Sequence, residues 1–185
     1  MNTRVRQCFL LFAMSLIVQN CISIKNTPRS NLTVLEKFDY KKLNGSYNNK
    51  ANSDSVSRGF NRHDHLWDLL GNARAQNIRG IYYDTCTVKI QFITPNKANI
   101  SLVRLNTIIK TKTIRGRFKM GYFYLHRRLH LIPFFPILFY YSDNLCRIGL
   151  LGTDLVVDYS GHGVAVMIIG ADSWQEGSKR YIKLE

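Results

Sequence analysis

Acidic residues are scarce in this chain. Its 185 residues include 12 Asp and Glu against 26 Lys and Arg, which gives a formal net charge of +14. Such a basic balance indicates nucleic acid, an anionic membrane surface or acidic polysaccharide as partner, or simply a basic secreted protein. With so few acids, the paired carboxylates that many hydrolases use are rarely available. We therefore expect no enzyme activity.

The short motifs of common catalytic and metal sites are also absent. No Gly-x-Ser-x-Gly, HExxH, CxxC or P-loop pattern occurs. Residues 63–65, His-Asp-His, are adjacent, so their side chains point apart and make a poor metal site. Residues 159–163 resemble the histidine motif of caspase-like cysteine proteases, but no cysteine follows His162 to act as nucleophile. We predict no catalytic residue, no metal and no cofactor, and His162 is interpreted as a turn residue.

Hydrophobic runs long enough to span a membrane are missing too. Residues 1–23 carry Arg4 and Arg6, then an apolar run from Cys8 to Val18, then small residues. This is the pattern of a secretory signal peptide, and the run is shorter than the roughly 18–20 residues that cross a bilayer. We predict a secreted protein with a signal peptide at 1–23, an extended arm at 24–36 and one folded domain at 37–185. The mature chain keeps a charge of +12.

Cysteine is rare in the predicted mature chain, which retains Cys86 and Cys146. In an oxidising compartment two cysteines suggest one disulfide, although each could pair with another chain or stay a buried thiol. Three N-x-S/T sequons fit the secretory route and predict glycosylation. The acceptors are Asn31, Asn44 and Asn99.

Aromatic residues, by contrast, are plentiful: ten Tyr and ten Phe, which favour β-structure. Residues 86–94 and 112–120 alternate apolar and polar side chains, as half-buried strands do. Residues 98–110 are β-rich, and their apolar parity shifts between Leu102 and Val103, which indicates a bulge. Further short strands are predicted at 134–141, 152–159, 164–170 and 179–184. This spacing, without a helical period, predicts an antiparallel sandwich or barrel.

Residues 37–47, "KFDYKKLNGSY", resemble the first conserved block of the lipocalins, in which Phe-Asp precedes Gly-x-Trp. Phe38, Asp39 and Gly45 match that block, and Tyr47 stands where the family has Trp. A second candidate for the first strand is 65–71, because Trp67 in "LWDLL" is similar to the aromatic strand that follows the block. The first strand is thus 43–49 or 65–71.

Residues 156–166, "VVDYSGHGVAV", resemble the second lipocalin block, with Asp158 and Tyr159 in its Asp-Tyr places. The resemblance implies an all-β fold: an eight-stranded antiparallel up-and-down barrel, or calyx, with a long polar loop near the first strand. The C-terminal helix of that family has no counterpart here. Since 134–141 and 164–170 are apolar on both faces, we expect self-association or a product of low stability.

A barrel of this kind can hold one small ligand among its inward side chains. The resemblance implies a secreted carrier of a small hydrophobic molecule that is retinoid-, bilin-, steroid- or fatty-acid-like. The residues expected to line the cup are Val88, Ile90, Phe92, Ile114, Phe118, Met120, Phe139 and Tyr141.

The alternative function is a basic secreted interaction protein that binds polyanions or an anionic surface, with the barrel as scaffold and no specific nucleic acid. The segment "HRRLH", 126–130, could bind phosphate or sulfate groups, or be a solvated loop. The position of the basic residues distinguishes the two functions. Basic residues on outward positions favour the hydrophobic carrier, and basic residues inside the cup favour an anionic ligand.

Overall fold

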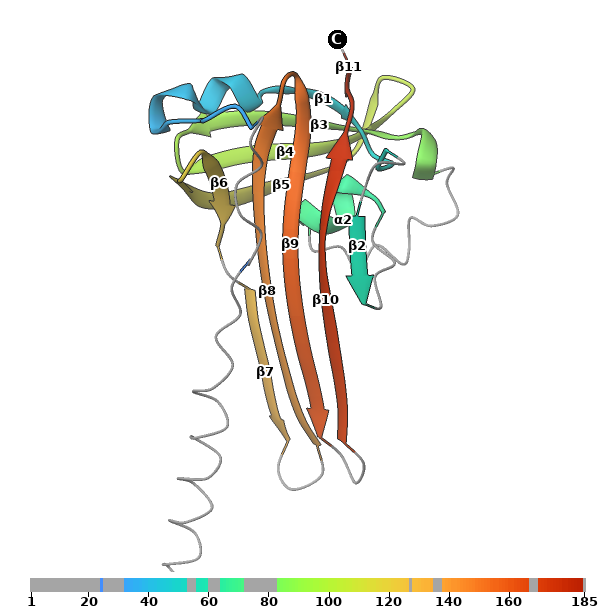
Figure 1. Cartoon of the computed structure of the whole chain (residues 1–185). Helices are drawn as coiled ribbons and strands as arrows, with labels where there is room; N and C mark the ends of the chain where they lie inside the picture. Colours follow the sequence, from blue (N-terminus) through green and yellow to red (C-terminus); the bar gives the residue numbers. More distant parts are fainter. Residues whose placement is uncertain are drawn as a thin grey trace, which may run out of the picture.

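The structure is a computed structural model (Figure 1), which describes residues 24, 32–52, 56–59, 64–71, 83–126, 128–134, 138–166 and 170–184. For 56–59, 128–134, 138–140, 165–166 and 170–173 it describes the backbone alone. The predicted signal peptide, most of the arm before residue 32 and Asn31 lie outside the described residues. No helix in the described ranges is long and apolar enough to cross a membrane.

The protein is all-β, as predicted, and the described strands pair antiparallel in one sheet with the order β11-β1-β3-β4-β5-β6-β8-β9-β10-β2, with β7 on β8. The strands are β1 (Gly45–Asn48), β2 (Val56–Gly59), β3 (Thr87–Thr94), β4 (Lys97–Arg104), β5 (Thr107–Lys119), β6 (Tyr122–Leu125), β7 (Arg128–Phe134), β8 (Leu138–Leu151), β9 (Asp154–Val166), β10 (Gly170–Tyr181) and β11 (Lys183–Leu184). The helices are η1 (Lys37–Leu43), α2 (Leu66–Gly71) and η3 (Tyr83–Thr85).

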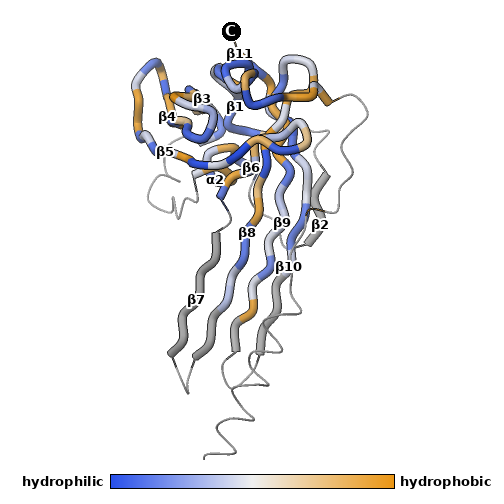
Figure 2. Tube along the Cα trace, turned by 90° about the vertical axis from the view of Figure 1, so that its left-hand side faces the viewer, coloured by the Kyte–Doolittle hydropathy of each residue, from blue (hydrophilic) through white to orange (hydrophobic). Residues whose placement is uncertain are grey.

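The strands form two regions that differ in shape. Strands β1 and β3–β6 cross the upper part of the molecule, and the long strands β8–β10 run through it and extend below, with β7 beside them (Figure 1). Hydrophobic residues are concentrated in the upper part, whereas the coloured lower stretches of β8–β10 are mostly hydrophilic or neutral (Figure 2). The core therefore lies in the upper part of the molecule.

The core follows from period-two alternation along the strands. In β3 the buried residues are Val88, Ile90 and Phe92, separated by half-buried or exposed ones. Their cross-strand partners Leu102, Ile100 and Ala98 are equally buried, because opposed residues of an antiparallel pair share a face. Strands β8–β10 and helix α2 contribute Ile148, Leu150, Leu155, Val157, Tyr181, Leu66, Trp67 and Leu70 to the same core.

The first strand is β1, so the prediction of 43–49 is right and that of a strand at 65–71 is wrong. Trp67 lies in helix α2 instead. Asn49, directly after β1, explains this: its carbonyl oxygen accepts from Leu66 N at 2.7 Å and its Oδ1 accepts from Trp67 N at 2.9 Å. Satisfying these amide groups lets a helix start where the local pattern favoured a strand.

The predicted polar loop after the first strand also contains regular structure. Its residues 56–59 form β2, which pairs with β10 from Gln175↔Gly59 to Ser178↔Val56. Part of the predicted extended arm contacts the sheet, because Thr33 forms a bridge to Leu150 and Leu35 is buried.

The two strands predicted at 152–159 and 164–170 are largely one strand, β9, so the turn between them is wrong. His162 lies within β9, opposite Asp143 of β8 and Trp174 of β10. The glycines do not interrupt the strand. A Cβ at Gly161 would lie 2.7 Å from side-chain atoms of both Asn144 and Gln175, so glycine makes room for its neighbours.

The predicted bulge is confirmed, since the β4–β5 register shifts between Leu102 and Val103. The prediction that Met120 points into the core is wrong. Met120 is 70 % exposed, with φ of 50°, because the chain turns there from β5 into β6 instead of continuing the strand.

Candidate functional site

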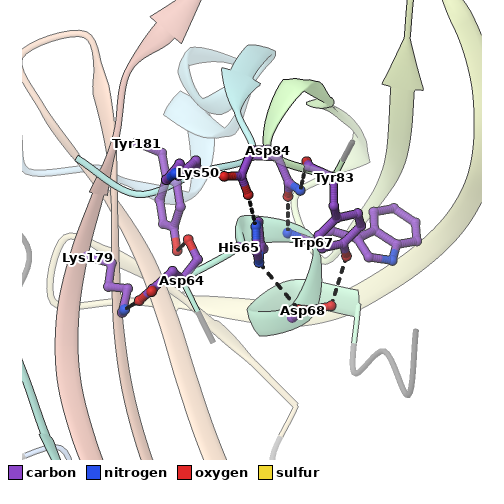
Figure 3. Close-up of polar contacts among 10 residues, drawn as sticks. Lys50, Asp64, His65, Trp67, Asp68, Tyr83, Asp84, Lys179 and Tyr181 are labelled. Carbon is purple, nitrogen blue, oxygen red and sulfur yellow. Dashed lines mark hydrogen bonds and ion pairs between the residues drawn. The ribbon is translucent and has the colours of Figure 1, made fainter. Parts of the chain in front are cut away.

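Helix α2 lies beside a network of polar side chains from the segment after β1, from η3 and from β10 (Figure 3). Asp84 is at its centre: its carboxylate lies 2.6 Å from Lys50 Nζ and 2.7 Å from His65 Nε2. These contacts, the Lys50 hydrogen bond first, hold the pKa of Asp84 below its ordinary value. Lys50 and His65 also form an antiparallel bridge through their backbones. The network therefore attaches His65, directly before α2, to Lys50, directly after Asn49.

Tyr83 connects η3 to the same helix. Its hydroxyl donates to Asp68 Oδ1 at 2.8 Å, and its ring centroid lies 4.5 Å from that of His65. Burial, and then the Asp68 contact, raise the pKa of Tyr83 above its ordinary value, so the phenol stays protonated and remains a donor. Asn49 Nδ2 completes the network by donating to Tyr83 O at 3.1 Å.

Two further contacts hold the start and the end of α2. Ahead of the helix, Asp64 forms an ion pair with the buried Lys179 of β10, and the Tyr181 hydroxyl donates to the Asp64 carbonyl (Figure 3). At the other end, Lys112 Nζ donates to the carbonyl of Gly71. A cation at the C-terminal carbonyls of a helix is favourable, because these groups carry partial negative charge.

Both lysines lie on the inner face of the sheet. Lys179 opposes Val157 and Lys112 opposes Ile100, and both of these partners belong to the core. The sequence made the position of basic residues the test between the two functions. Lys179 is buried and paired with Asp64, and Lys112 is exposed and donates to Gly71, so neither lysine distinguishes the two functions.

Lys112 also lines a cavity of about 420 Å³ between β4, β5 and the end of β6. We call it the basic pocket. Its lining residues are Lys97, Lys112, Thr113, Ile114, Arg115, Leu125 and His126. Four of the seven carry basic side chains and none is acidic, so the pocket suits an anion.

The basic pocket brings like charges together. Lys97 of β4 lies directly opposite Arg115 of β5. Like charges at directly opposed positions of an antiparallel pair are destabilising. In the described part of the chain, the side chains of Lys97, Arg115 and His126 take part in no hydrogen bond or ion pair that would offset this. A bound anion would offset it.

The surrounding sequence explains the missing counter-charge. Between Asp84 and Asp143 the chain contains ten Lys and Arg and no Asp or Glu. This acid-free segment, 85–142, includes β3–β7. The shape of the pocket depends on Gly116, because a Cβ there would lie 2.1 Å from the carbonyl oxygen of Tyr124. Glycine thus lets β6 lie close against β5 at the pocket.

Most of the residues predicted to line an apolar cup belong to one core cluster or pack against it, and this cluster also includes residues of α2. Val88, Ile90, Phe92 and Ile114 belong to the same core cluster as Leu66, Trp67 and Leu70, and Phe118 packs against it. Phe92 meets the Phe123 ring edge-to-face and Phe118 meets it at a tilt, with centroid distances of 4.9 and 5.1 Å.

The β8 residues of the predicted cup lie elsewhere. Tyr141 donates to Asp143 and so shares the face of Arg147, opposite to the core face of Ile148. The prediction that it points inward is wrong. The side chain of Phe139 lies outside the described residues.

The residues of the first lipocalin-like block differ in burial. Phe38 is 87 % exposed, and Asp39 closes a capping box with Glu36 at the start of η1. Tyr47 is fully buried and donates to Leu43 O at 3.0 Å, while a Cβ at Gly45 would lie 2.6 Å from Lys183.

The second block contributes buried residues too. Asp158 accepts from Arg147 Nε at 2.9 Å and from Ser178 Oγ at 2.5 Å, on the outer face of β8–β10. On the other face, burial raises the pKa of Tyr159 to about 12. These roles are structural.

Cys86 and Cys146 are free thiols, so the structure has no disulfide between them. Cys86 is buried and burial raises the pKa of its thiol, which makes it less reactive. Of the sequons, Asn44 accepts from Phe92 N and Asn99 accepts from Thr113 Oγ1. Glycosylation at both positions stays a prediction.

Comparison with known proteins identified no matching family model, no matching curated protein and no matching solved structure. Among the described residues, no group of His, Cys, Asp and Glu is arranged to hold a metal ion. Sequence reasoning considered His126 for phosphate or sulfate but missed Lys97, Lys112 and Arg115. The signal that would have found them is the length of the acid-free segment.

Proposed function

We propose that this protein binds a small anionic molecule, or the anionic group of a larger one, in the basic pocket. The observation that carries the proposal is the unpaired, like-charged Lys97–Arg115 pair beside Lys112 and His126 in one cavity. Natural proteins keep such an arrangement where an external anion completes it, because charge-assisted hydrogen bonds to phosphate, sulfate or carboxylate are strong. Its volume of about 420 Å³ is in the range of small-molecule sites.

We propose further that the scaffold is a closed eight-stranded barrel. Three features support this: β1, β3, β4, β5, β6, β8, β9 and β10 neighbour one another in chain order, β11 pairs with β1, and only Ile182 separates β10 from β11. The final segment, β10 with β11, therefore pairs with β9 through β10 and with β1 through β11. An up-and-down order of this kind agrees with the lipocalin resemblance, which remains a proposal, as does secretion.

A carrier of a small hydrophobic molecule is the competing proposal of the sequence. Its cup residues are packed with Leu66, Trp67 and Leu70 of α2. A hydrophobic ligand would therefore have to displace α2 or find space beside it, whereas the basic pocket is open. For this reason we favour the anionic ligand.

The test is isothermal titration of the protein, without the predicted signal peptide, with inorganic phosphate, sulfate and a sulfated disaccharide. At least one should bind saturably, and R115Q should weaken its binding about tenfold, because one charge-assisted hydrogen bond contributes roughly 1.5–3 kcal/mol. The matched control is K89Q, which removes one positive charge from an exposed position of β3 outside the pocket.

Equal weakening by K89Q and R115Q would mean that net charge, and not the pocket, attracts the anion. No saturable binding of any of the three anions by folded protein would refute the proposal. Saturable binding of a fluorescent fatty acid that F118D abolishes would support the hydrophobic carrier instead.

A further inference from the structure

The turn between β4 and β5 is formed by a residue that is unusual there. Leu105 and Asn106 both have positive φ, 45° and 61°. Two-residue hairpin turns of this type favour Asn, Asp and Gly, and a bulky apolar residue in this conformation is unfavourable. Asn106 suits the turn, but Leu105 does not. Its presence is therefore not explained by the needs of the turn.

Leu105 belongs to an exposed aliphatic cluster at this end of the hairpin, the loop at the upper right of Figure 1. Leu105 is 89 % exposed, Ile108 is 60 % exposed and Ile109 is 36 % exposed. Further along the same hairpin, Ile100 and Leu102 are fully buried. The hairpin is thus buried at Ile100 and Leu102, whereas the aliphatic side chains at its turn are exposed to solvent. We call residues 105–109 the aliphatic tip.

The confirmed bulge contributes to this exposure. Lys110 pairs with Leu102 and Ile108 pairs with Val103, so Ile109 has no register partner. Bulges redirect side chains and bend the strand. The tip therefore carries three aliphatic residues within five positions.

Basic residues flank the aliphatic tip on both strands. Arg104 ends β4, and Lys110 follows the tip on β5. The tip lies within the acid-free segment, so its surroundings in the chain add positive charge and no negative charge. We call Arg104 and Lys110 the basic collar of the tip. An aliphatic tip with basic residues beside it fits an anionic bilayer, because the apolar side chains enter the acyl region and the cations contact the head groups.

The composition of the tip separates a bilayer from other polyanions. Single-stranded nucleic acid is bound by aromatic side chains that stack on bases, and duplexes by polar side chains that reach base edges. Residues 105–109 contain neither an aromatic nor a charged side chain. Aliphatic side chains gain from burial in hydrocarbon, which a polysaccharide or nucleic acid does not offer.

We propose that the aliphatic tip docks this protein on an anionic lipid bilayer, with Leu105, Ile108 and Ile109 inserted and Arg104 and Lys110 at the head groups. The proposal does not depend on the basic pocket, since the inserted residues are not among those that line the cavity. It names a surface partner in addition to the small anion.

The test is cosedimentation of the protein, without the predicted signal peptide, with phosphatidylcholine vesicles and with vesicles that contain about 30 % phosphatidylserine. We expect binding to the anionic vesicles alone, and a loss of at least about tenfold in the double variant L105S/I108S. M120S is the matched control, because Met120 is an apolar residue at another hairpin turn, with an exposure between those of Ile108 and Leu105, and it should bind like the parent protein. Circular dichroism confirms that each variant is folded.

A second variant tests the collar. K110Q should weaken vesicle binding and make it less sensitive to salt while leaving phosphate binding unchanged, because Lys110 does not line the basic pocket. The proposal is overturned if the anionic vesicles do not bind, or if L105S/I108S binds them as well as the parent does. Binding of heparin or single-stranded RNA that is lost in L105S/I108S, with no vesicle binding, would assign the tip to that polyanion instead.

Discussion

Charged residues are handled differently in the two halves of the sheet. Along β8–β10, Arg147 pairs with Asp158 of the neighbouring strand, with both side chains about 5 % exposed, and the partly exposed Arg180 pairs with Asp154 at 2.7 Å. Along β4–β6, Lys97, Arg115 and His126 share a cavity with no acid. The paired charges on β8–β10 satisfy one another, whereas the like charges of Lys97 and Arg115 repel each other and are available to a ligand.

The largest effect should come from breaking a pair on β8–β10. D158A leaves the Arg147 guanidinium buried without its carboxylate, between Tyr124, whose hydroxyl it contacts at 3.0 Å, and Tyr122. We expect a loss of about 3–5 kcal/mol in the free energy of unfolding, measured by urea denaturation. The double variant R147M/D158L removes both charges and should lose much less. An equal loss in both variants would show that packing, and not the unpaired charge, is responsible.

The next effect concerns the start of α2. N49A removes the side-chain acceptor for Trp67 N and the donor to Tyr83 O, so we expect a loss of about 1–2 kcal/mol in unfolding free energy. N48A is the control, since the neighbouring Asn48 makes no side-chain hydrogen bond in the described part of the chain. If N48A is as destabilised as N49A, the side-chain hydrogen bonds of Asn49 are not what holds α2 in place.

The basic pocket should give a smaller effect of the opposite sign. K97Q removes one of two like charges that face each other across β4 and β5. We expect the unfolding free energy to stay equal or rise by a few tenths of a kcal/mol, while affinity for the anion falls. Thermal denaturation with and without the bound anion measures both. A clear loss of stability in K97Q without anion would show that Lys97 has a structural role.

The smallest effect is expected at Asp84, which is exposed. Its pKa is lowered in the folded protein, chiefly by Lys50 and then by His65. The stabilisation it provides is therefore complete above the ordinary carboxyl pKa and is lost as the pH falls through the lowered one. D84N should remove this small decline between about pH 5 and pH 2 in denaturation midpoints. The same decline in D84N would assign it to other carboxyl groups.

Much of the upper sheet could be predicted from local pattern. The alternation of 86–94 indicates β3 with Val88, Ile90 and Phe92 inside, and the parity shift at Leu102 indicates the bulge. The pattern fails at Met120 and in β9. A turn reverses the chain after Lys119, and paired neighbours on both sides keep Gly161 and His162 in a strand. Alternation reports which face is buried, but it does not report where a strand ends.

By itself, the sequence determined the β-rich class, the period-two core of β3–β5 and the acid-free segment, because these depend on residues close together in the chain. The tertiary structure decided which charges are paired and which are open. Lys179 finds its partner 115 residues away in Asp64, and α2 forms where Asn49, from the end of β1, meets residues 66 and 67. Lys97 and Arg115 face each other only because the β4–β5 register, bulge included, aligns them. Such pairings depend on distances across the fold, which local composition does not contain.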